Sequence, residues 1–146
     1  MKKIYTIGTS NRQAQDFIEI LKFYEISLLV DVRRFPTSKL EHFKKKNLEK
    51  LCRMNGIDYR WLGDLLGGYR TGGYEAYMNT LSFQNGLIEL KALAQKVTTA
   101  FCCAEKFPWK CHRRFIANKL KSQGWSVIHI LEKNKTWSKQ QLDLFE

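Results

Sequence analysis

Short apolar runs rich in β-branched and aromatic residues alternate along this chain with longer segments whose apolar residues recur at helical spacing. The apolar runs predict five strands, at residues 3–11, 27–36, 57–62, 97–105 and 125–131. The longer amphipathic segments predict four helices, over residues 13–26, 40–56, 84–96 and 111–124. Strands that alternate with helices in this way are typical of parallel sheets built from right-handed β–α–β units.

We therefore expect a single doubly wound, Rossmann-like α/β domain with a mainly parallel sheet of about five strands and helices on both faces. The near-continuous apolar run at 27–36 supports this fold, because a strand covered on both faces carries few polar residues. Five glycines within residues 63–73 predict a loop after the third strand. The domain is expected to cover residues 1–132, and the polar, aperiodic residues 133–146 are expected to form a C-terminal tail.

The composition is that of a globular cytoplasmic protein. The chain has 146 residues, of which 44% are hydrophobic, and this length is enough to build one sizeable core. It contains only two prolines, as is typical of a globular rather than a disordered chain. The N-terminal apolar run is too short for a signal peptide, and no stretch approaches the ~20 apolar residues of a membrane helix. Four irregularly spaced cysteines without an export signal indicate reduced thiols. We therefore expect a cytoplasmic protein that has no membrane partner.

The charge of the chain favours an anionic partner. Lys and Arg number 25 against 14 Asp and Glu, which gives a formal net charge of +11. That surplus exceeds what solubility requires and is typical of proteins that bind DNA or a phosphate-bearing ligand. A generally basic surface without a dedicated partner is the alternative interpretation.

Polar and reactive side chains follow the predicted strands, and parallel strands bring their carboxyl ends to one rim of a sheet. These residues are Ser10, Asn11 and Arg12 after the first strand, Asp31 and Arg33 after the second, Gly67, Gly68 and Arg70 after the third, and Cys103, Glu105, Cys111, His112 and Arg113 after the fourth. The opposite rim offers mostly the loop sequences EIS, NGI and QGW, which carry little chemistry. The asymmetry predicts one functional site at the carboxyl ends of the strands.

Cations at the start of the last predicted helix indicate an anion site. Arginine and lysine side chains there oppose the helix macrodipole at a cost of roughly 0.3–1 kcal/mol each, and a bound anion would reverse that sign. The alternative is a structural network in which Asp31 and Glu105 neutralise the arginines. The anion hypothesis assigns binding to Ser10, Asn11, Arg12, Arg33, Gly67, Gly68, Arg70 and Arg113, with Asp31, Glu105 and His112 as acid–base candidates.

Cysteines near the same rim indicate a second kind of chemistry. Adjacent strand residues face opposite sides of a sheet, so only Cys103 of the pair Cys102–Cys103 is expected at the rim. A thiol beside cations is a competent nucleophile, which makes Cys103 and Cys111 candidates for covalent catalysis or redox partnership. Inert core cysteines are the alternative. These thiols and His112 lack the paired C-x2-C spacing of zinc sites, so no metal and no cofactor are expected.

Several motifs, in this order, resemble those of the uncharacterised family catalogued as domain of unknown function 488: TIGTSNR, LVDVRRFPTS, LGGYR, CAEKFPWKCHRRFIA and VIHI. The first motif of that family usually reads TIGHSNR, and Thr9 stands here in place of its histidine. The resemblance implies an α/β fold without an established activity. It implies motif positions at Gly8, Ser10, Asn11, Asp31, Arg33, Pro36, Ser38, Gly67, Gly68, Arg70, Cys103, Glu105, Cys111, His112 and Arg113.

The last residues of the chain contain a second resemblance. The sequence QLDLF is similar to the peptide QL(S/D)LF with which bacterial DNA-metabolism proteins bind the β sliding clamp. Two apolar side chains would fill a pocket on the clamp, and the glutamine would hydrogen-bond at its edge. A hydrophobic end that folds back onto the domain is the alternative. The clamp hypothesis assigns partner binding to Gln141, Leu142, Asp143, Leu144 and Phe145.

Together, these features favour a cytoplasmic protein with an anion-binding or phosphate-binding rim that acts on nucleic acid or a nucleotide in DNA repair or replication. Two alternatives remain open. One is a small-molecule enzyme that uses a thiolate, at Cys103 or Cys111. The other is a DNA-binding adaptor without catalytic activity.

Overall fold

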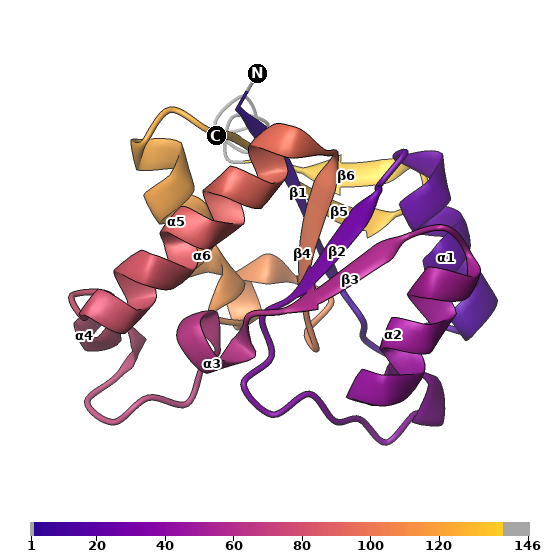
Figure 1. The fold of residues 1–146 in the computed structure, drawn as a ribbon, viewed down its shortest axis with the longest axis horizontal. Helices are drawn as coiled ribbons and strands as arrows, with labels where there is room; N and C mark the ends of the chain where they lie inside the picture. Colours follow the sequence, from indigo (N-terminus) through magenta and orange to yellow (C-terminus); the bar gives the residue numbers. More distant parts are fainter. Residues whose placement is uncertain (1, 139–146) are drawn as a thin grey trace.

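A six-stranded sheet forms the centre of the protein, of which the computed structural model describes residues 2–138 (Figure 1). In sheet order the strands are β3 (Asp58–Trp61), β2 (Leu28–Asp31), β4 (Thr99–Cys103), β1 (Lys3–Gly8), β5 (Ser126–Glu132) and β6 (Lys135–Trp137). The first five of these are parallel, and β6 runs antiparallel to β5. The predicted doubly wound α/β fold is therefore confirmed, with one strand more than expected.

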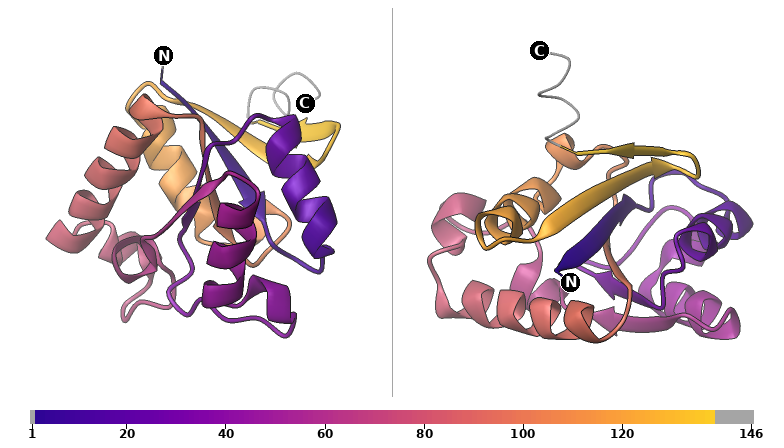
Figure 2. Two further views of the ribbon diagram at one scale, coloured as in Figure 1. Left: turned by 45° about the vertical axis from the view of Figure 1, so that its right-hand side comes forward. Right: turned by 90° about the horizontal axis from the view of Figure 1, so that it is seen from above.

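Helices cover both faces of the sheet, as Figure 2 makes clear from two further directions. One face carries α1 (Ala14–Phe23) and α2 (Lys45–Met54), and the other carries α5 (Leu81–Lys96) and α6 (Arg113–Ser122). The connections also contain single turns: η1 (Glu41–Phe43), α3 (Gly63–Leu66), α4 (Tyr74–Tyr77) and η2 (Pro108–Lys110). None of the helices among residues 2–138 is both long and apolar enough to span a bilayer.

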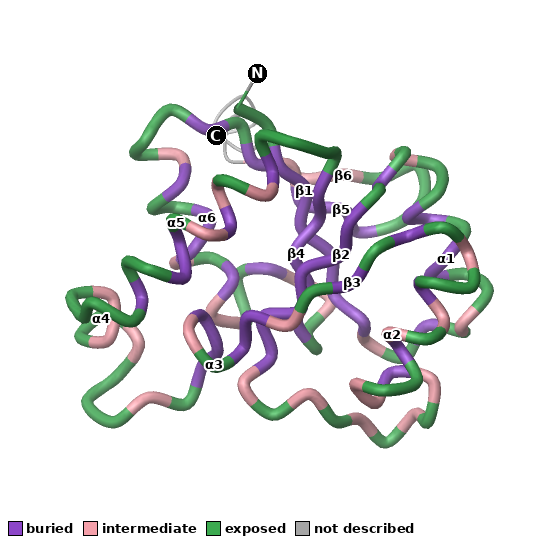
Figure 3. Tube along the Cα trace, in the orientation of Figure 1, coloured by how far each residue is buried: buried purple, intermediate pink, exposed green. Residues whose placement is uncertain are grey.

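The two faces bury separate apolar cores, because strand side chains alternate between them. In β2, Leu28 and Val30 pack toward α5 and α6, whereas Leu29 packs toward α1 and α2. The central strands are buried along their length, and exposed residues gather on the helices and loops (Figure 3). In β4, Cys102 and Cys103 belong to opposite cores, as the alternation predicts.

Two segments differ from their predicted structure. The glycine-rich loop after β3 contains the short helices α3 and α4, which fold because their residues pack against the α5 side of the sheet. Residues 135–137, expected within a tail, form β6 and pair with β5 at His129–Trp137 and Ile130–Thr136. A strand of three residues is too short to produce a recognisable period in a polar sequence.

Candidate functional site

The sulfurs of Cys103 and Cys111 lie 2.7 Å apart at the carboxyl ends of the central strands. Cys103 is the last residue of β4. Cys111 directly precedes His112, the N-cap residue of α6. Both are free thiols, and their separation is only about 0.7 Å longer than a disulfide bond. We refer to these two residues as the thiol pair. The structure therefore brings together the two cysteines that the sequence indicates as nucleophile or redox candidates.

Arg113 supports the thiol pair from the interior of the protein. Its backbone N–H and its Nε donate to Cys111 Sγ at 3.3 Å and 3.4 Å. The other end of the guanidinium donates to Thr6 Oγ1 at 3.0 Å and to the carbonyl of Glu105 at 2.6 Å. Arg113 is completely buried, and no carboxylate of the described residues pairs with it. Because a buried cation is costly without a countercharge, its surroundings favour the anionic form of Cys111.

The two thiols consequently differ in protonation. Hydrogen bonds from Cys103 and from Arg113, together with the Arg113 charge, outweigh burial and lower the pKa of Cys111 to about 6. Burial and the hydrogen bond to Cys111 raise the pKa of Cys103 well above its ordinary value. The N-terminal amide of α6 adds a further donor to the Cys111 sulfur, a position at which helix dipoles stabilise thiolates. These opposite directions favour Cys111 over Cys103 as the thiolate of the pair.

The thiol pair faces a pocket of about 520 Å³, which we call the thiol pocket. Three connections form its walls, and each follows the carboxyl end of a strand. The lining residues are Arg33, Arg34, Phe35 and Thr37 after β2, Gly68, Tyr69 and Tyr74 after β3, and Cys103, Ala104, Glu105, Lys110, Cys111 and His112 after β4. The volume is in the range of small-molecule sites.

Several walls of the thiol pocket were not among the predicted site residues. Phe35 and Tyr69 are 60% and 84% exposed, and their ring centroids lie 6.0 Å apart. The Arg34 guanidinium lies 5.4 Å from the Phe35 ring and donates to the Tyr69 carbonyl. Lys110 also lines the pocket and is exposed. The sequence signal for these residues is weak, since it consists of single aromatic and basic residues within loops.

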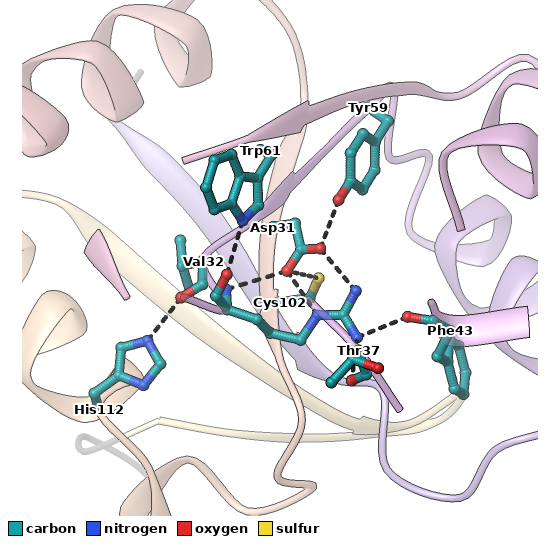
Figure 4. A network of polar contacts seen from close by, with 9 residues as sticks. Asp31, Val32, Thr37, Phe43, Tyr59, Trp61, Cys102 and His112 are labelled. Carbon is teal, nitrogen blue, oxygen red and sulfur yellow. Dashed lines mark hydrogen bonds and ion pairs between the residues drawn. The ribbon is translucent and has the colours of Figure 1, made fainter. Parts of the chain in front are cut away.

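His112 lines the thiol pocket as a neutral ring. Its Nε2 donates to the carbonyl of Val32 at 3.0 Å, which leaves Nδ1 as an acceptor (Figure 4). Burial, aided by the charges of Arg113 and Arg70, lowers the pKa of His112 to about 4. Gly68 lies against this ring, and a Cβ there would come within 3.1 Å of Nδ1. The geometry therefore favours His112 as a fixed hydrogen-bond acceptor over a proton donor at neutral pH.

Asp31 forms a buried ion pair with Arg33, a residue of the thiol-pocket lining, and Figure 4 shows the network of polar contacts around the Asp31 carboxylate. Two guanidinium nitrogens of Arg33 donate to the two Asp31 oxygens at 2.8 Å, and Tyr59 Oη donates to the same carboxylate at 2.6 Å. The remaining Arg33 nitrogen donates to the carbonyl of Phe43 at 2.7 Å. Although burial opposes the charge, these bonds to Asp31 raise the pKa of Arg33. This geometry matches the structural-network alternative for Asp31 and Arg33.

Arg12 lies away from the thiol pocket with its donors occupied. Its guanidinium donates to the carbonyls of Gly8 and Leu131 at 2.9 Å and 2.8 Å and pairs with Glu132 at 3.5 Å. Ser10, Asn11 and Arg12 line a separate pocket of about 400 Å³, whose other walls include three carboxylates, from Asp16, Glu19 and Glu132. The predicted set of anion-binding residues is thus dispersed: Arg33 and Gly68 line the thiol pocket, and Gly67, Arg70 and Arg113 are in the lining of neither pocket.

Arg70 and Gly67 serve the local fold of the α3 region. Arg70 donates to the carbonyls of Gly67, Gly63 and Asp64 at 2.9, 3.3 and 2.6 Å, and its guanidinium lies 4.0 Å from the Tyr77 ring centroid. A Cβ at Gly67 would lie 2.3 Å from the Gly63 carbonyl oxygen, so this position requires glycine. The guanidinium of Arg70 thus donates to acceptors of the protein itself, as do those of Arg12, Arg33 and Arg113.

Glu105 contributes its backbone to the site more than its side chain. Its carbonyl accepts from Arg113, while the residue is exposed at the edge of the thiol pocket. Gly8 makes this arrangement possible, because a Cβ at Gly8 would lie 1.8 Å from the Glu105 carbonyl oxygen. Within residues 2–138, no three His, Cys, Asp or Glu side chains gather to hold a metal ion.

The residues assigned to clamp binding, Gln141, Leu142, Asp143, Leu144 and Phe145, lie outside the part of the chain that the structure describes. That hypothesis therefore stays a prediction.

Comparison with known proteins identifies the family of this chain. Neither the curated proteins nor the solved structures that were searched gave a match to this chain. A family model does match, over residues 13–120, and that span includes both sulfurs of the thiol pair and most walls of the thiol pocket. This match confirms the resemblance seen in the motifs: the chain belongs to the family described as Domain of unknown function DUF488.

Proposed function

We propose that the thiol pocket binds a small anionic molecule and that the Cys111 thiolate reacts with it as a nucleophile. The observation that carries this proposal is the position of Cys111, which lines the pocket while Arg113 donates to its sulfur and the Cys103 sulfur lies 2.7 Å away. A nucleophile needs both access to its substrate and stabilisation of its anionic form. Cys111 has both, which makes the thiolate alternative the one best supported by the geometry.

The walls of the thiol pocket indicate the class of ligand. Arg34 and Lys110 are cationic residues of the pocket lining, and the aromatic residues Phe35, Tyr69 and Tyr74 of that lining offer flat apolar surface. The neutral His112 ring adds one hydrogen-bond acceptor. An anion that also carries a planar group fits this combination, and a nucleotide is one such molecule. The sequence assigned anion binding to other arginines, whose side chains donate to acceptors of the protein itself. We assign this role instead to Arg34 and Lys110 of the thiol-pocket lining.

Competitive alkylation tests this function. Wild-type protein is treated with anionic iodoacetate and with neutral iodoacetamide, and modified cysteines are located by peptide mapping. We expect Cys111 to react first with both reagents, and Cys111→Ser to remove the fast reaction. We expect Arg34→Ala to lower the preference for iodoacetate by about fivefold, which corresponds to about 1 kcal/mol at a partly exposed site.

Lys119→Ala provides the matched control, because it removes an exposed cation from the far end of α6. It should leave the reagent preference unchanged. Equal reactivity of Cys111 and the buried Cys52 would contradict the proposal, since Cys52 has its pKa raised by burial.

Nucleic-acid binding is a second candidate function, favoured by an aromatic and basic surface beside the pocket. The Phe107 and Trp109 rings stack at a centroid distance of 5.0 Å, and Lys106 and Lys110 lie 5.7 Å and 5.8 Å from the Phe107 centroid. Stacked aromatics among cations are the elements with which proteins hold single strands. The net charge of +11 supports the same partner, and with it a role in DNA repair or replication.

Binding of a fluorescent single-stranded oligonucleotide separates the two candidates. For an adaptor without catalysis, Trp109→Ala should weaken binding and Cys111→Ser should leave it unchanged. Salt-independent or undetectable binding would count against this candidate. A cytoplasmic location also belongs to the proposal, because a reducing compartment maintains free thiols.

The clamp hypothesis extends the second candidate. Binding of purified bacterial β clamp to the intact protein, lost in a Leu144→Ala/Phe145→Ala variant, would support a place in DNA metabolism. Equal binding of both proteins, or none by either, would remove this support.

A further inference from the structure

Of the two cysteines that line the thiol pocket, Cys111 is the more accessible. Cys111 is half-buried, whereas Cys103 is 2% exposed, and their sulfurs touch at 2.7 Å. A substrate that enters the pocket therefore meets Cys111 first. Cys103 is placed to attack whatever becomes bonded to the Cys111 sulfur.

From this geometry we propose that the thiol pair carries out thiol–disulfide exchange with small anionic disulfides, with Cys111 as the attacking thiol and Cys103 as the resolving thiol. The inference rests on the proposed nucleophilic function of Cys111 and adds a reaction and a substrate class. Its physical basis is that no unfolding is needed to close the bond, since the sulfurs have to approach by only about 0.7 Å.

The backbone fixes Cys103 within the sheet, whereas Cys111 lies in a short connection that can shift. Cys103 ends a central strand, and its carbonyl accepts from the Thr9 amide at 2.8 Å. Cys111 lies between the single turn η2 and helix α6, and its amide donates to the Pro108 carbonyl at 3.3 Å. A small shift of this short connection brings the Cys111 sulfur to bonding distance while β4 stays in place.

The exchange balances in two steps. The Cys111 thiolate attacks one sulfur of the substrate disulfide, the substrate S–S bond breaks, and the first substrate thiolate leaves with the electron pair. Cys103 then attacks the Cys111 sulfur of the mixed disulfide, and its proton leaves with the second substrate thiol. The substrate disulfide is reduced to two thiols, and the thiol pair is oxidised to one disulfide. A dithiol reductant must return the pair to its starting state.

Arg113 determines how readily the pair is reduced. The oxidised pair carries no charge, so Arg113 loses the thiolate that compensates it in the reduced state. Stabilisation of the reduced form makes a disulfide more oxidising. We therefore expect a Cys103–Cys111 disulfide to be easily reduced, as suits a catalytic pair rather than a structural crosslink.

The substrate class follows from the pocket walls. Arg34 and Lys110 favour a disulfide with carboxylate or phosphate groups over a cationic one. Glutathione disulfide is a suitable anionic probe, and cystamine is a cationic disulfide with the same reacting bond. Faster reaction with glutathione disulfide is expected for wild type, and this preference should fall in Arg34→Ala but persist in Lys119→Ala.

The test uses the full chain, glutathione disulfide, an acid quench and peptide mass mapping. We expect wild type to form an internal Cys103–Cys111 disulfide with little mixed disulfide. Cys103→Ser and Cys103→Ala should both accumulate glutathione on Cys111, Cys111→Ser should not react, and Cys52→Ser should behave as wild type. Far-ultraviolet circular dichroism confirms that each variant is folded.

Two outcomes would overturn the inference. One is wild type that stops at the mixed disulfide, and the other is a folded Cys103 variant that forms no more mixed disulfide than wild type. If Cys111 is rapidly alkylated by iodoacetate yet forms no internal disulfide, the nucleophilic function stands and the exchange reaction falls. If Cys111 reacts with neither reagent, both fall.

Discussion

The buried guanidinium of Arg113 and the sulfur of Cys111 form a direct contact, with Nε–Sγ and N–Sγ distances of 3.4 Å and 3.3 Å. Both donors come from one residue at the start of α6. The charge of the site and the helix that carries it are therefore coupled through a single residue, by its backbone N–H and its side chain. This coupling leads to the first prediction.

Arg113→Gln should raise the pKa of Cys111 toward the ordinary thiol value of about 8.5, because the nearby cation is removed. The rate of Cys111 alkylation at neutral pH should fall by about tenfold or more, since it follows the thiolate fraction. The measurement is the pH dependence of that rate. Arg114→Gln is the control, because the Arg114 side chain is exposed and donates to the Trp109 carbonyl, and the substitution leaves its backbone bond to Cys111 in place. Identical midpoints in all three proteins would contradict the prediction.

His129 should make the protein sensitive to acid. Burial, with the charges of Arg113 and Lys121, lowers the pKa of His129 to about 3, below its ordinary 6.5. The ring Nδ1 lies 2.6 Å from Thr6 Oγ1 in a buried hydrogen bond, and Arg113 donates to the same hydroxyl. Below pH 6.5 the unfolded chain binds a proton that the folded chain does not, so the free energy of unfolding should fall as pH drops from about 6.5 toward 3.

Urea unfolding of wild type and His129→Gln between neutral pH and pH 4 checks this. The variant should show a shallower loss of stability over that range, whatever its stability at neutral pH. In the variant, His112 still makes the free energy of unfolding depend on pH, because burial also lowers its pKa. Equal slopes in both proteins would show that His129 contributes nothing to acid sensitivity.

Asp31→Asn should destabilise the fold without changing the reactivity of Cys111. The substitution leaves Arg33 as a buried cation without its countercharge and replaces one of its two carboxylate acceptors by an NH2 donor, which typically costs about 3–5 kcal/mol. Glu49→Gln removes a partly exposed partner of Arg53 and should change the free energy of unfolding by less than about 1 kcal/mol. Chemical denaturation measures both. A shift in the pH midpoint of Cys111 alkylation in folded Asp31→Asn would instead favour the acid–base role predicted from sequence.

Gly8→Ala should be more damaging than Gly124→Ala. At Gly8 a Cβ would lie 1.8 Å from the Glu105 carbonyl oxygen, so the connection that bonds Arg113 has to move. At Gly124 a Cβ meets no atom within 4 Å, and the cost is limited to the left-handed backbone, with φ of +89°. That cost is about 1–2 kcal/mol. Thermal unfolding and Cys111 alkylation should both change in Gly8→Ala, whereas only the former should change in Gly124→Ala.

The fold followed from local patterns that carry a strong physical signal. Continuous apolar strands and amphipathic helices were recognisable because each buries a whole face, and the alternation of Cys102 and Cys103 followed from strand geometry. β6 was missed because its three residues are too few to show alternation. The resemblance to the family rested on motifs that extend over most of the chain, and the family match confirms it.

The site was predictable in place but not in detail. Sequence placed Cys103, Cys111 and His112 at one rim, and they do line one pocket. It could not reveal that Arg12, Arg33, Arg70 and Arg113 bond to the protein's own acceptors, because the acceptors are mostly carbonyls that every sequence contains. The predicted site also left out Arg34 and Lys110. Whether a side chain of a loop lines a pocket depends on tertiary packing, which the sequence pattern does not show.

The added strand β6 also affects how copies of the protein meet. Without it, the seven-residue strand β5 would present an open row of backbone donors and acceptors. With it, the two edges of the sheet are the three-residue β6 and the four-residue β3, both of which carry exposed charged side chains such as Lys135 and Arg60. Short, charged edges resist pairing with a neighbouring sheet. The molecule is thus protected against edge-to-edge aggregation at the high local concentrations of a cell.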